Sequence, residues 1–115
     1  MTNAIVYGTV VHGPPARTFL DGSQYWVSDL LTVRIGLGHY RPGWVWSEHA
    51  GAQTGKPSQA HVGYIQSGTM MVEDSHGNRV ELHAGDAFEL APGCNAWVIG
   101  GEACVALDVT VRPTE

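Results

Sequence analysis

Short segments of alternating apolar and polar residues follow one another along this chain, and Gly or Pro bounds most of them. Alternation with a period of two is typical of half-buried β-strands. The segments cover residues 30–40, 44–49, 61–66, 69–73, 79–83, 87–90, 94–99 and 103–111. No stretch keeps a helical period with capping residues, so the pattern predicts an all-β sandwich or barrel. A small closed double sheet also protects the edges that so many short strands would otherwise expose.

Two of these segments have clearly defined faces. In residues 30–40, alternate positions from Leu31 to Leu37 are apolar, which predicts that this face packs on the core. His39 follows on the same face, where a hydrogen-bonded core histidine is a more common finding than a metal ligand. In residues 103–111, valine and leucine occupy one face, and Cys104 begins the other.

Length and composition point to one domain. At 115 residues the chain is long enough for a single hydrophobic core. Its formal net charge of −5 leaves no basic face for nucleic acid or for an anionic membrane. The sequence has no apolar run of about eighteen residues and no signal-peptide layout at its start, so we expect a cytoplasmic protein. Two cysteines, Cys94 and Cys104, are too few for a disulfide framework and are expected to be free thiols, metal ligands or core residues.

Six histidines are present, and they are the first candidates for metal binding or catalysis in this chain. His76 lies in a predicted hairpin tip and His83 precedes a turn, so both are expected in solvent. His12 lies in a loop near the N-terminus. His49 and His61 each lie beside a turn at the end of a predicted strand, where side chains can converge on the mouth of a barrel.

Three stretches resemble the motifs of a known family. GWVWSEH (43–49) has the spacing G-x5-H, HVGYIQSG (61–68) ends on a glycine seven residues after a histidine, and GDAFELAPGCNAW (85–97) contains a turn, a strand and a Pro-Gly break. These stretches are similar to the two motifs of the cupin superfamily, G-x5-H-x-H-x3-4-E-x6-G and G-x5-P-x-G-x2-H-x3-N. In that family three histidines and a glutamate usually hold a metal ion.

The resemblance implies a cupin-type jelly-roll barrel. It implies one cupin domain over residues 1–115, with residues 1–29 as an N-terminal strand or arm and residues 30–111 as the barrel core. It is much less specific for function, because cupins carry out many different activities.

The metal-ligand positions depart from the family pattern. His49 matches the first histidine, but the second falls on Gly51 and the histidine of the second motif falls on Ala96. His61 occupies the glutamate position, and Cys94 lies two residues before the lost histidine, on the same face of the strand. The resemblance therefore implies a site of His49, His61 and Cys94, with one transition-metal ion per chain, Zn, Fe, Ni or Cu.

The residues around this site have alternative interpretations. Glu48 either orients a metal ligand by hydrogen bonding, acts as a catalytic base, or is an exposed carboxylate at a strand end. Gln59, on the same face as His61, could hydrogen-bond a metal-bound water or supply a weak oxygen ligand to the metal. Trp46 either belongs to an aromatic wall that stacks on a ligand or packs in the core or at a dimer surface. The alternative for the whole site is that metal binding has been lost, and that His61 and Cys94 line an apolar pocket.

Three functions are compatible with these residues. The preferred one is a metal-binding cupin that acts on a small organic molecule as a dioxygenase, lyase or isomerase. The second is a non-catalytic module that binds a small molecule or a metal, and the third is a structural barrel with no ligand. Apolar residues on both faces of several strands, as in YIQSGTMMV (64–72), also predict a homodimer with a two-fold interface.

Overall fold

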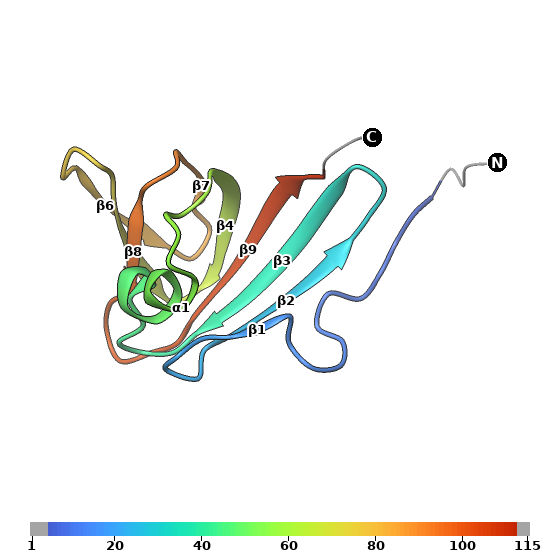
Figure 1. Cartoon of the computed structure of the whole chain (residues 1–115), viewed down its shortest axis with the longest axis horizontal. Helices are drawn as coiled ribbons and strands as arrows, with labels where there is room; N and C mark the ends of the chain where they lie inside the picture. Colours follow the sequence, from blue (N-terminus) through green and yellow to red (C-terminus); the bar gives the residue numbers. More distant parts are fainter. Residues whose placement is uncertain (1–4, 113–115) are drawn as a thin grey trace.

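The computed structural model describes residues 5–112, which form two antiparallel β-sheets that face each other (Figure 1). The larger sheet has the strand order β1-β2-β3-β9-β4-β7, and the smaller one has the order β6-β5-β8. The strands are β1 (Arg17–Thr18), β2 (Gln24–Asp29), β3 (Val33–Tyr40), β4 (His61–Ser67), β5 (Thr69–Glu73), β6 (Arg79–His83), β7 (Ala87–Leu90), β8 (Asn95–Val98) and β9 (Cys104–Val111). The predicted all-β jelly roll is confirmed.

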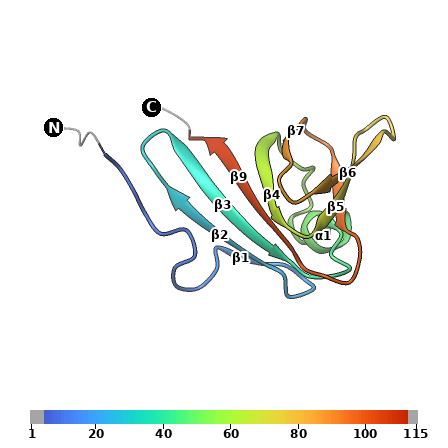
Figure 2. The ribbon, with the colours of Figure 1, turned by 180° about the vertical axis from the view of Figure 1, so that it is seen from behind.

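The larger sheet extends beyond the smaller one. β3 pairs with β9 along its whole length, from Val33 opposite Val111 to Tyr40 opposite Cys104. In both ribbon views, β2, β3 and β9 continue past the end of the sheet that β5, β6 and β8 form (Figures 1 and 2). The inner face of the larger sheet is therefore covered at one end and open at the other.

The hydrophobic core lies at the covered end. Ile65 on β4 and Cys104 on β9 are fully buried, and Met70 and Val72 of the smaller sheet belong to the same cluster. Cys104, predicted to be a thiol, a ligand or a core residue, is part of the core. Burial raises the pKa of its thiol to about 11, so Cys104 is an unreactive packing residue.

The inward face of β3 is not the one that the sequence predicts. His39 is exposed and packs edge-on against Trp26, with 5.6 Å between ring centroids, whereas Gly36 and Gly38 are buried. A Cβ atom on Gly38 would lie 2.2 Å from the ring of Tyr40. Aromatic rings that lie over the two glycines therefore fill the inner face of β3. The prediction that the apolar phase from Leu31 to Leu37 packs on the core was wrong for this reason.

Residues 44–49 do not form the predicted strand. Val45 makes a single β-bridge to Trp97, and the chain then enters a π-helix, η1 (Ser47–Gly51), and a short helix, α1 (Ala52–Thr54). The turn is held by two hydrogen bonds of 2.9 Å: the Val45 N–H donates to Nδ1 of His49, and the His49 N–H donates to the Val45 carbonyl. The side chain of His49 thus accepts from the Val45 N–H in place of a strand carbonyl. The alternation of apolar and polar residues gives no sign of such a bond.

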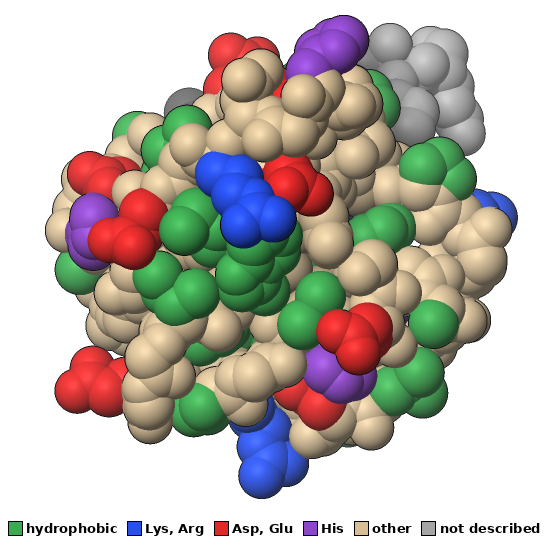
Figure 3. Space-filling view, turned by 90° about the vertical axis from the view of Figure 1, so that its left-hand side faces the viewer, with side chains coloured by type: hydrophobic (Ala, Val, Ile, Leu, Met, Phe, Trp, Pro, Cys, Tyr) green, Lys and Arg blue, Asp and Glu red, His purple; other side chains and the backbone are tan. Residues whose placement is uncertain are grey.

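The outer face of the smaller sheet is polar. Arg79 pairs with Glu73 at 2.7 Å and lies over the ring of Trp97, and Glu81 pairs with His83. Charged side chains of both signs are spread among hydrophobic ones on this side of the molecule (Figure 3).

The N-terminal segment adds to the larger sheet. The predicted arm, residues 1–29, contains β1 and β2, and its residues 1–4 lie outside the described part. The indole N–H of Trp26 donates to the carbonyl of Gly13 at 3.2 Å, which ties the segment before β1 to the sheet. Within residues 5–112, no helix is long and apolar enough to cross a membrane.

Candidate functional site

A cavity of about 1020 Å³ lies on the inner face of the larger sheet. Its lining comes from β2, β3, β5, β7, β8 and β9, and from Thr54 and residues 56–61, which lead into β4. Ser58 fastens this run to the turn before β8, because its hydroxyl donates to the carbonyl of Cys94 at 2.7 Å. The volume is in the range of sites that enclose small molecules.

Aromatic rings line one end of the cavity. Trp44 packs against Tyr40 with 4.3 Å between ring centroids and edge-on against Phe19 at 5.6 Å. Trp46 and Tyr25 also line the cavity. We call Phe19, Tyr40 and Trp44 the aromatic wall. Such rings offer flat apolar surfaces at a low cost in side-chain entropy, which suits the body of an organic ligand.

The aromatic wall contains an unsatisfied hydrogen-bond donor. Trp44 is only 3% exposed, and its indole Nε1 has no hydrogen-bond partner among the described residues. Leaving a buried donor unpaired costs about 1–3 kcal/mol, and native proteins rarely tolerate this without a role for the group. The nitrogen has less than 1 Å² of accessible surface, so it is closed to an acceptor in the cavity as the rings are arranged.

The middle of the cavity contains a half-buried hydrogen bond between β2 and β9. The Tyr25 hydroxyl donates to Oδ1 of Asp108 at 2.7 Å. A Cβ atom on Gly36 would lie 1.9 Å from the Tyr25 hydroxyl oxygen and 2.2 Å from Oδ1, so only glycine leaves room for the pair. Burial, followed by the neighbouring Asp108 carboxylate, raises the pKa of the Tyr25 phenol well above its usual value. Tyr25 therefore remains a neutral donor at any physiological pH.

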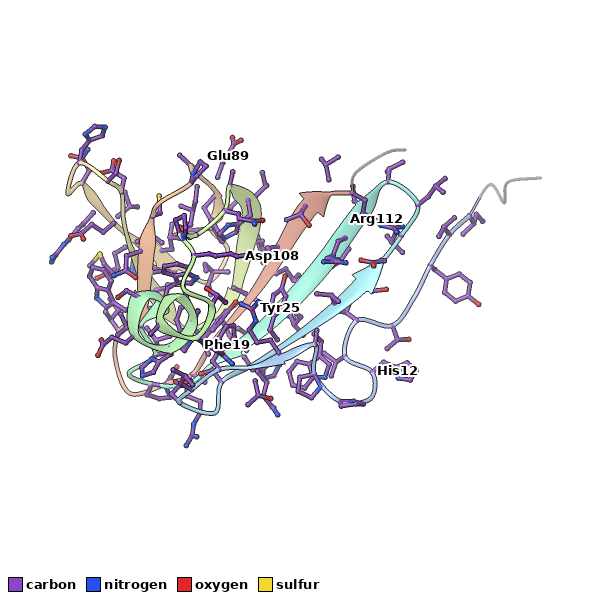
Figure 4. The ribbon with its side chains drawn as sticks, viewed as in Figure 1. His12, Phe19, Tyr25, Glu89, Asp108 and Arg112 are labelled. Carbon is purple, nitrogen blue, oxygen red and sulfur yellow. The ribbon has the colours of Figure 1, made fainter. Side chains whose placement is uncertain are left out.

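Figure 4 shows how these residues follow one another along the cavity. Phe19, Tyr25 and Asp108 lie in succession along the inner side of the larger sheet, from its covered end outwards. Arg112 lies farther along, at the open end, while His12 projects from the N-terminal loop on the far side of the sheet from the cavity. The cavity thus runs from the aromatic wall, past the Tyr25–Asp108 pair, to the open end.

Four of the six predicted site residues line this cavity. His61, Cys94, Gln59 and Trp46 are all part of its walls. Nδ1 of His61 lies 3.1 Å from the backbone carbonyl of Gln59, and since a carbonyl only accepts, this nitrogen carries the hydrogen. Nε2 of the neutral ring is then the acceptor. Gln59 fixes the His61 ring through its backbone, which was not predicted.

The other two predicted residues do not line the cavity. Glu48 is exposed on η1. Nδ1 of His49 accepts the Val45 N–H, so Nε2 of the neutral ring carries the hydrogen. With this hydrogen bond in place, neither ring nitrogen of His49 has a lone pair for a metal ion.

The side chains as arranged do not fit a metal centre. No group of three His, Cys, Asp or Glu residues within 5–112 is arranged to hold an ion. His61 and Cys94 share the cavity, but a three-ligand site also needs His49.

Sequence reasoning missed the Tyr25–Asp108 pair and the aromatic wall. Tyr25 and Asp108 are 83 residues apart, and neither belongs to a motif. One available signal was the spacing of Gly36 and Gly38, because glycines at alternate strand positions mark a face that other groups approach closely.

Comparison with known proteins gives a family match and structural likenesses. The model of the EutQ-like cupin domain matches residues 42–112. No curated protein sequence matches the chain. The fold is similar to KdgF from Halomonas sp., at a TM-score of 0.59 and 21% identity over 81% of this chain and 82% of that one. It is also similar to a cupin domain from Bordetella pertussis, at a TM-score of 0.56 and 17% identity over 89% and 99%.

A third likeness is to part of a larger enzyme. Oxalate decarboxylase from Bacillus subtilis, a protein with Mn(II) centres, matches at a TM-score of 0.60 and 20% identity. The match covers 90% of this chain but 29% of that one. At these identities the likenesses show the fold alone.

Proposed function

Because this chain belongs to the EutQ-like cupin domain family, we propose that it binds a small organic molecule in the cavity of the larger sheet. The observation that carries the proposal is the aromatic wall, the rings of Phe19, Tyr40 and Trp44 at one end of a cavity of about 1020 Å³. Rings that line a cavity of this size offer a contact surface for the apolar body of a small molecule.

Binding is proposed in preference to metal-dependent catalysis. The His49 ring accepts a hydrogen bond from the Val45 N–H, and Glu48 lies outside the cavity. A metal-dependent dioxygenase, lyase or isomerase is the second candidate. It is favoured by one observation, that Cys94 and the acceptor nitrogen of His61 line the same cavity. The metal content of purified wild-type protein and of His61→Ala separates the two candidates, because a metal enzyme holds an ion that the variant loses.

We also propose that two copies pair through the outer face of the larger sheet. Neighbouring outward positions form apolar rows across β3, β9 and β4; one row is Ile35, Val109 and Val62, with Val109 38% and Val62 48% exposed. No outward position of these three strands carries a charge. An uncharged apolar face is complementary to itself, which suits a second copy related by a two-fold axis.

A fragment screen tests the binding proposal. Ligand-observed NMR with a few hundred neutral and charged fragments identifies binders, and Ala96→Leu should abolish their binding because Ala96 lines the cavity. Ala87→Leu, at an exposed position of β7, is the matched control. Hits that bind Ala96→Leu as well as they bind wild type, or no hits at all, would contradict the proposal.

A further inference from the structure

Charge is unevenly distributed between the cavity and the rest of the protein. Four of the six lysine and arginine residues line the cavity, namely Arg17, Arg34, Lys56 and Arg112. Among the described residues, Asp108 is the one carboxylate in the lining, although the chain has a net charge of −5. A cavity with excess positive charge attracts and retains anions, even in an acidic protein.

Two of the four cations form neither an ion pair nor a side-chain hydrogen bond among the described residues. Arg34 forms an ion pair with Asp29 at 2.5 Å, and Arg112 donates to a backbone carbonyl. Arg17 and Lys56 form no ion pair with any residue in the part of the chain that the structure describes. These two side chains are therefore available to pair with a charge that enters the cavity.

One of the available cations lies at the aromatic wall. The guanidinium carbon of Arg17 is 5.9 Å from the centroid of Phe19, and Phe19 packs directly on Trp44. A cation thus borders the rings that line one end of the cavity. A carboxylate can accept hydrogen bonds from its guanidinium while the organic body to which it is joined contacts the rings.

We infer that the ligand is an organic acid, a carboxylate joined to a flat apolar body. Arg17 and Lys56 recognise the carboxylate, and the rings of the aromatic wall stack on the body. This inference rests on the proposed function and adds the chemical class of the ligand. A neutral molecule of the same shape would leave the cations unpaired, and a small anion without the apolar body would leave the rings uncovered.

A matched pair of probes tests the two halves of the inference. We would measure dissociation constants for 4-fluorobenzoate, 4-fluorobenzamide and acetate by NMR titration, following ¹⁹F for the aromatic probes and the indole N–H signals for all three. The acid and the amide share ring and size and differ in charge. We expect 4-fluorobenzoate to bind about tenfold or more tightly than either other probe, since charge-assisted hydrogen bonds are the stronger ones. Its affinity should also fall as salt is added.

Three variants assign the recognition to residues. Arg17→Gln and Lys56→Gln are at exposed positions and should each weaken 4-fluorobenzoate binding several-fold, with little effect on the amide. Trp44→Phe replaces the indole with a smaller ring and should weaken both aromatic probes, because each stacks on the aromatic wall. Arg79→Gln is the control, since Arg79 lies on the outer face of the smaller sheet and should change neither.

Each other outcome overturns the inference. Equal affinities for acid and amide would remove the preference for an anion while leaving the proposed small-molecule binding intact. A preference that survives in the double variant of Arg17→Gln and Lys56→Gln would show that these cations do not supply it. If no probe binds while neutral fragments from the screen do, the ligand is not an acid; if nothing binds in either experiment, the proposed function fails as well.

Discussion

Replacing Tyr25 with phenylalanine isolates the hydrogen bond in the middle of the cavity. The substitution removes one oxygen and leaves the ring over Gly36. It also leaves the Asp108 carboxylate without a hydrogen-bond donor, since the Tyr25 hydroxyl is its one donor among the described residues. The bond is short, at 2.7 Å, and joins strands at opposite ends of the sequence.

The expected cost follows from this geometry. A hydrogen bond to a charged group contributes about 1.5–3 kcal/mol, and a buried acceptor left unpaired adds to the loss. For a domain of this size, 1 kcal/mol shifts the melting temperature by roughly 3–6 °C. Tyr25→Phe should therefore lower the melting temperature by about 5–15 °C, with a parallel fall in the urea midpoint and an unchanged slope.

The assay compares Tyr25→Phe with Tyr7→Phe in urea and thermal unfolding. Tyr7 precedes β1, is 90% exposed and makes no side-chain hydrogen bond among the described residues, so its variant should stay within about 0.5 kcal/mol of wild type. A loss in Tyr25→Phe no larger than in this control would refute the reasoning. Tyr25→Phe should lose less free energy of unfolding in an Asp108→Asn background, where the acceptor is neutral, than in the wild-type background. An equal loss in the two backgrounds would also refute the reasoning.

Alkaline pH gives an independent test of the same pair. Because the pKa of the Tyr25 phenol is raised in the folded state, its contribution to stability is complete below the unfolded value of about 10 and is lost as the pH rises above it. Wild type should lose free energy of unfolding between about pH 10 and 12, and Tyr25→Phe should lose less. Identical pH slopes in the two proteins would contradict the assignment.

The remaining predictions concern the cysteines, the helical turn and the dimer. With a thiol-specific disulfide reagent at pH 8, half-buried Cys94 should react in the native protein, whereas Cys104, with a pKa of about 11, should react only after unfolding. Rapid reaction of both thiols in the native protein would contradict the burial of Cys104 in the core. His49→Ala should lower the free energy of unfolding by about 1 kcal/mol, because the Val45 N–H loses its acceptor, and should leave the metal content unchanged. His76→Ala, at an exposed turn, should change neither the free energy of unfolding nor the metal content. Val109→Lys should convert a dimer, measured by light scattering, into a monomer; a wild-type monomer would exclude the pairing.

The sequence was sufficient for the fold because strand signals are local. Short period-two segments between Gly and Pro identified β4 to β9 nearly residue by residue. The period shows which residues share a face but not which face is covered, and so the inward side of β3 was assigned wrongly. Gly36 and Gly38 lie on that side because rings from β2 and β3 fill the space above them.

The candidate site could be predicted only in part. His61, Cys94, Gln59 and Trp46 do line one cavity, because motif spacing carries over when strands keep their register. His49 does not, because its ring completes a helical turn that no motif describes. The same limit hid the Tyr25–Asp108 pair, which depends on packing between distant strands.

The indole N–H signal of Trp44 gives the most direct test of the proposed function. In a ¹H–¹⁵N spectrum the four tryptophans give four indole signals, which single Trp→Phe variants assign. A fragment that binds in the cavity should shift the Trp44 signal, because it stacks on the Trp44 ring, and should leave those of Trp26 and Trp97 in place, because these two lie outside the cavity. Binding that shifts only Trp26 or Trp97, or a Trp44 signal that no fragment moves, would contradict the proposed function.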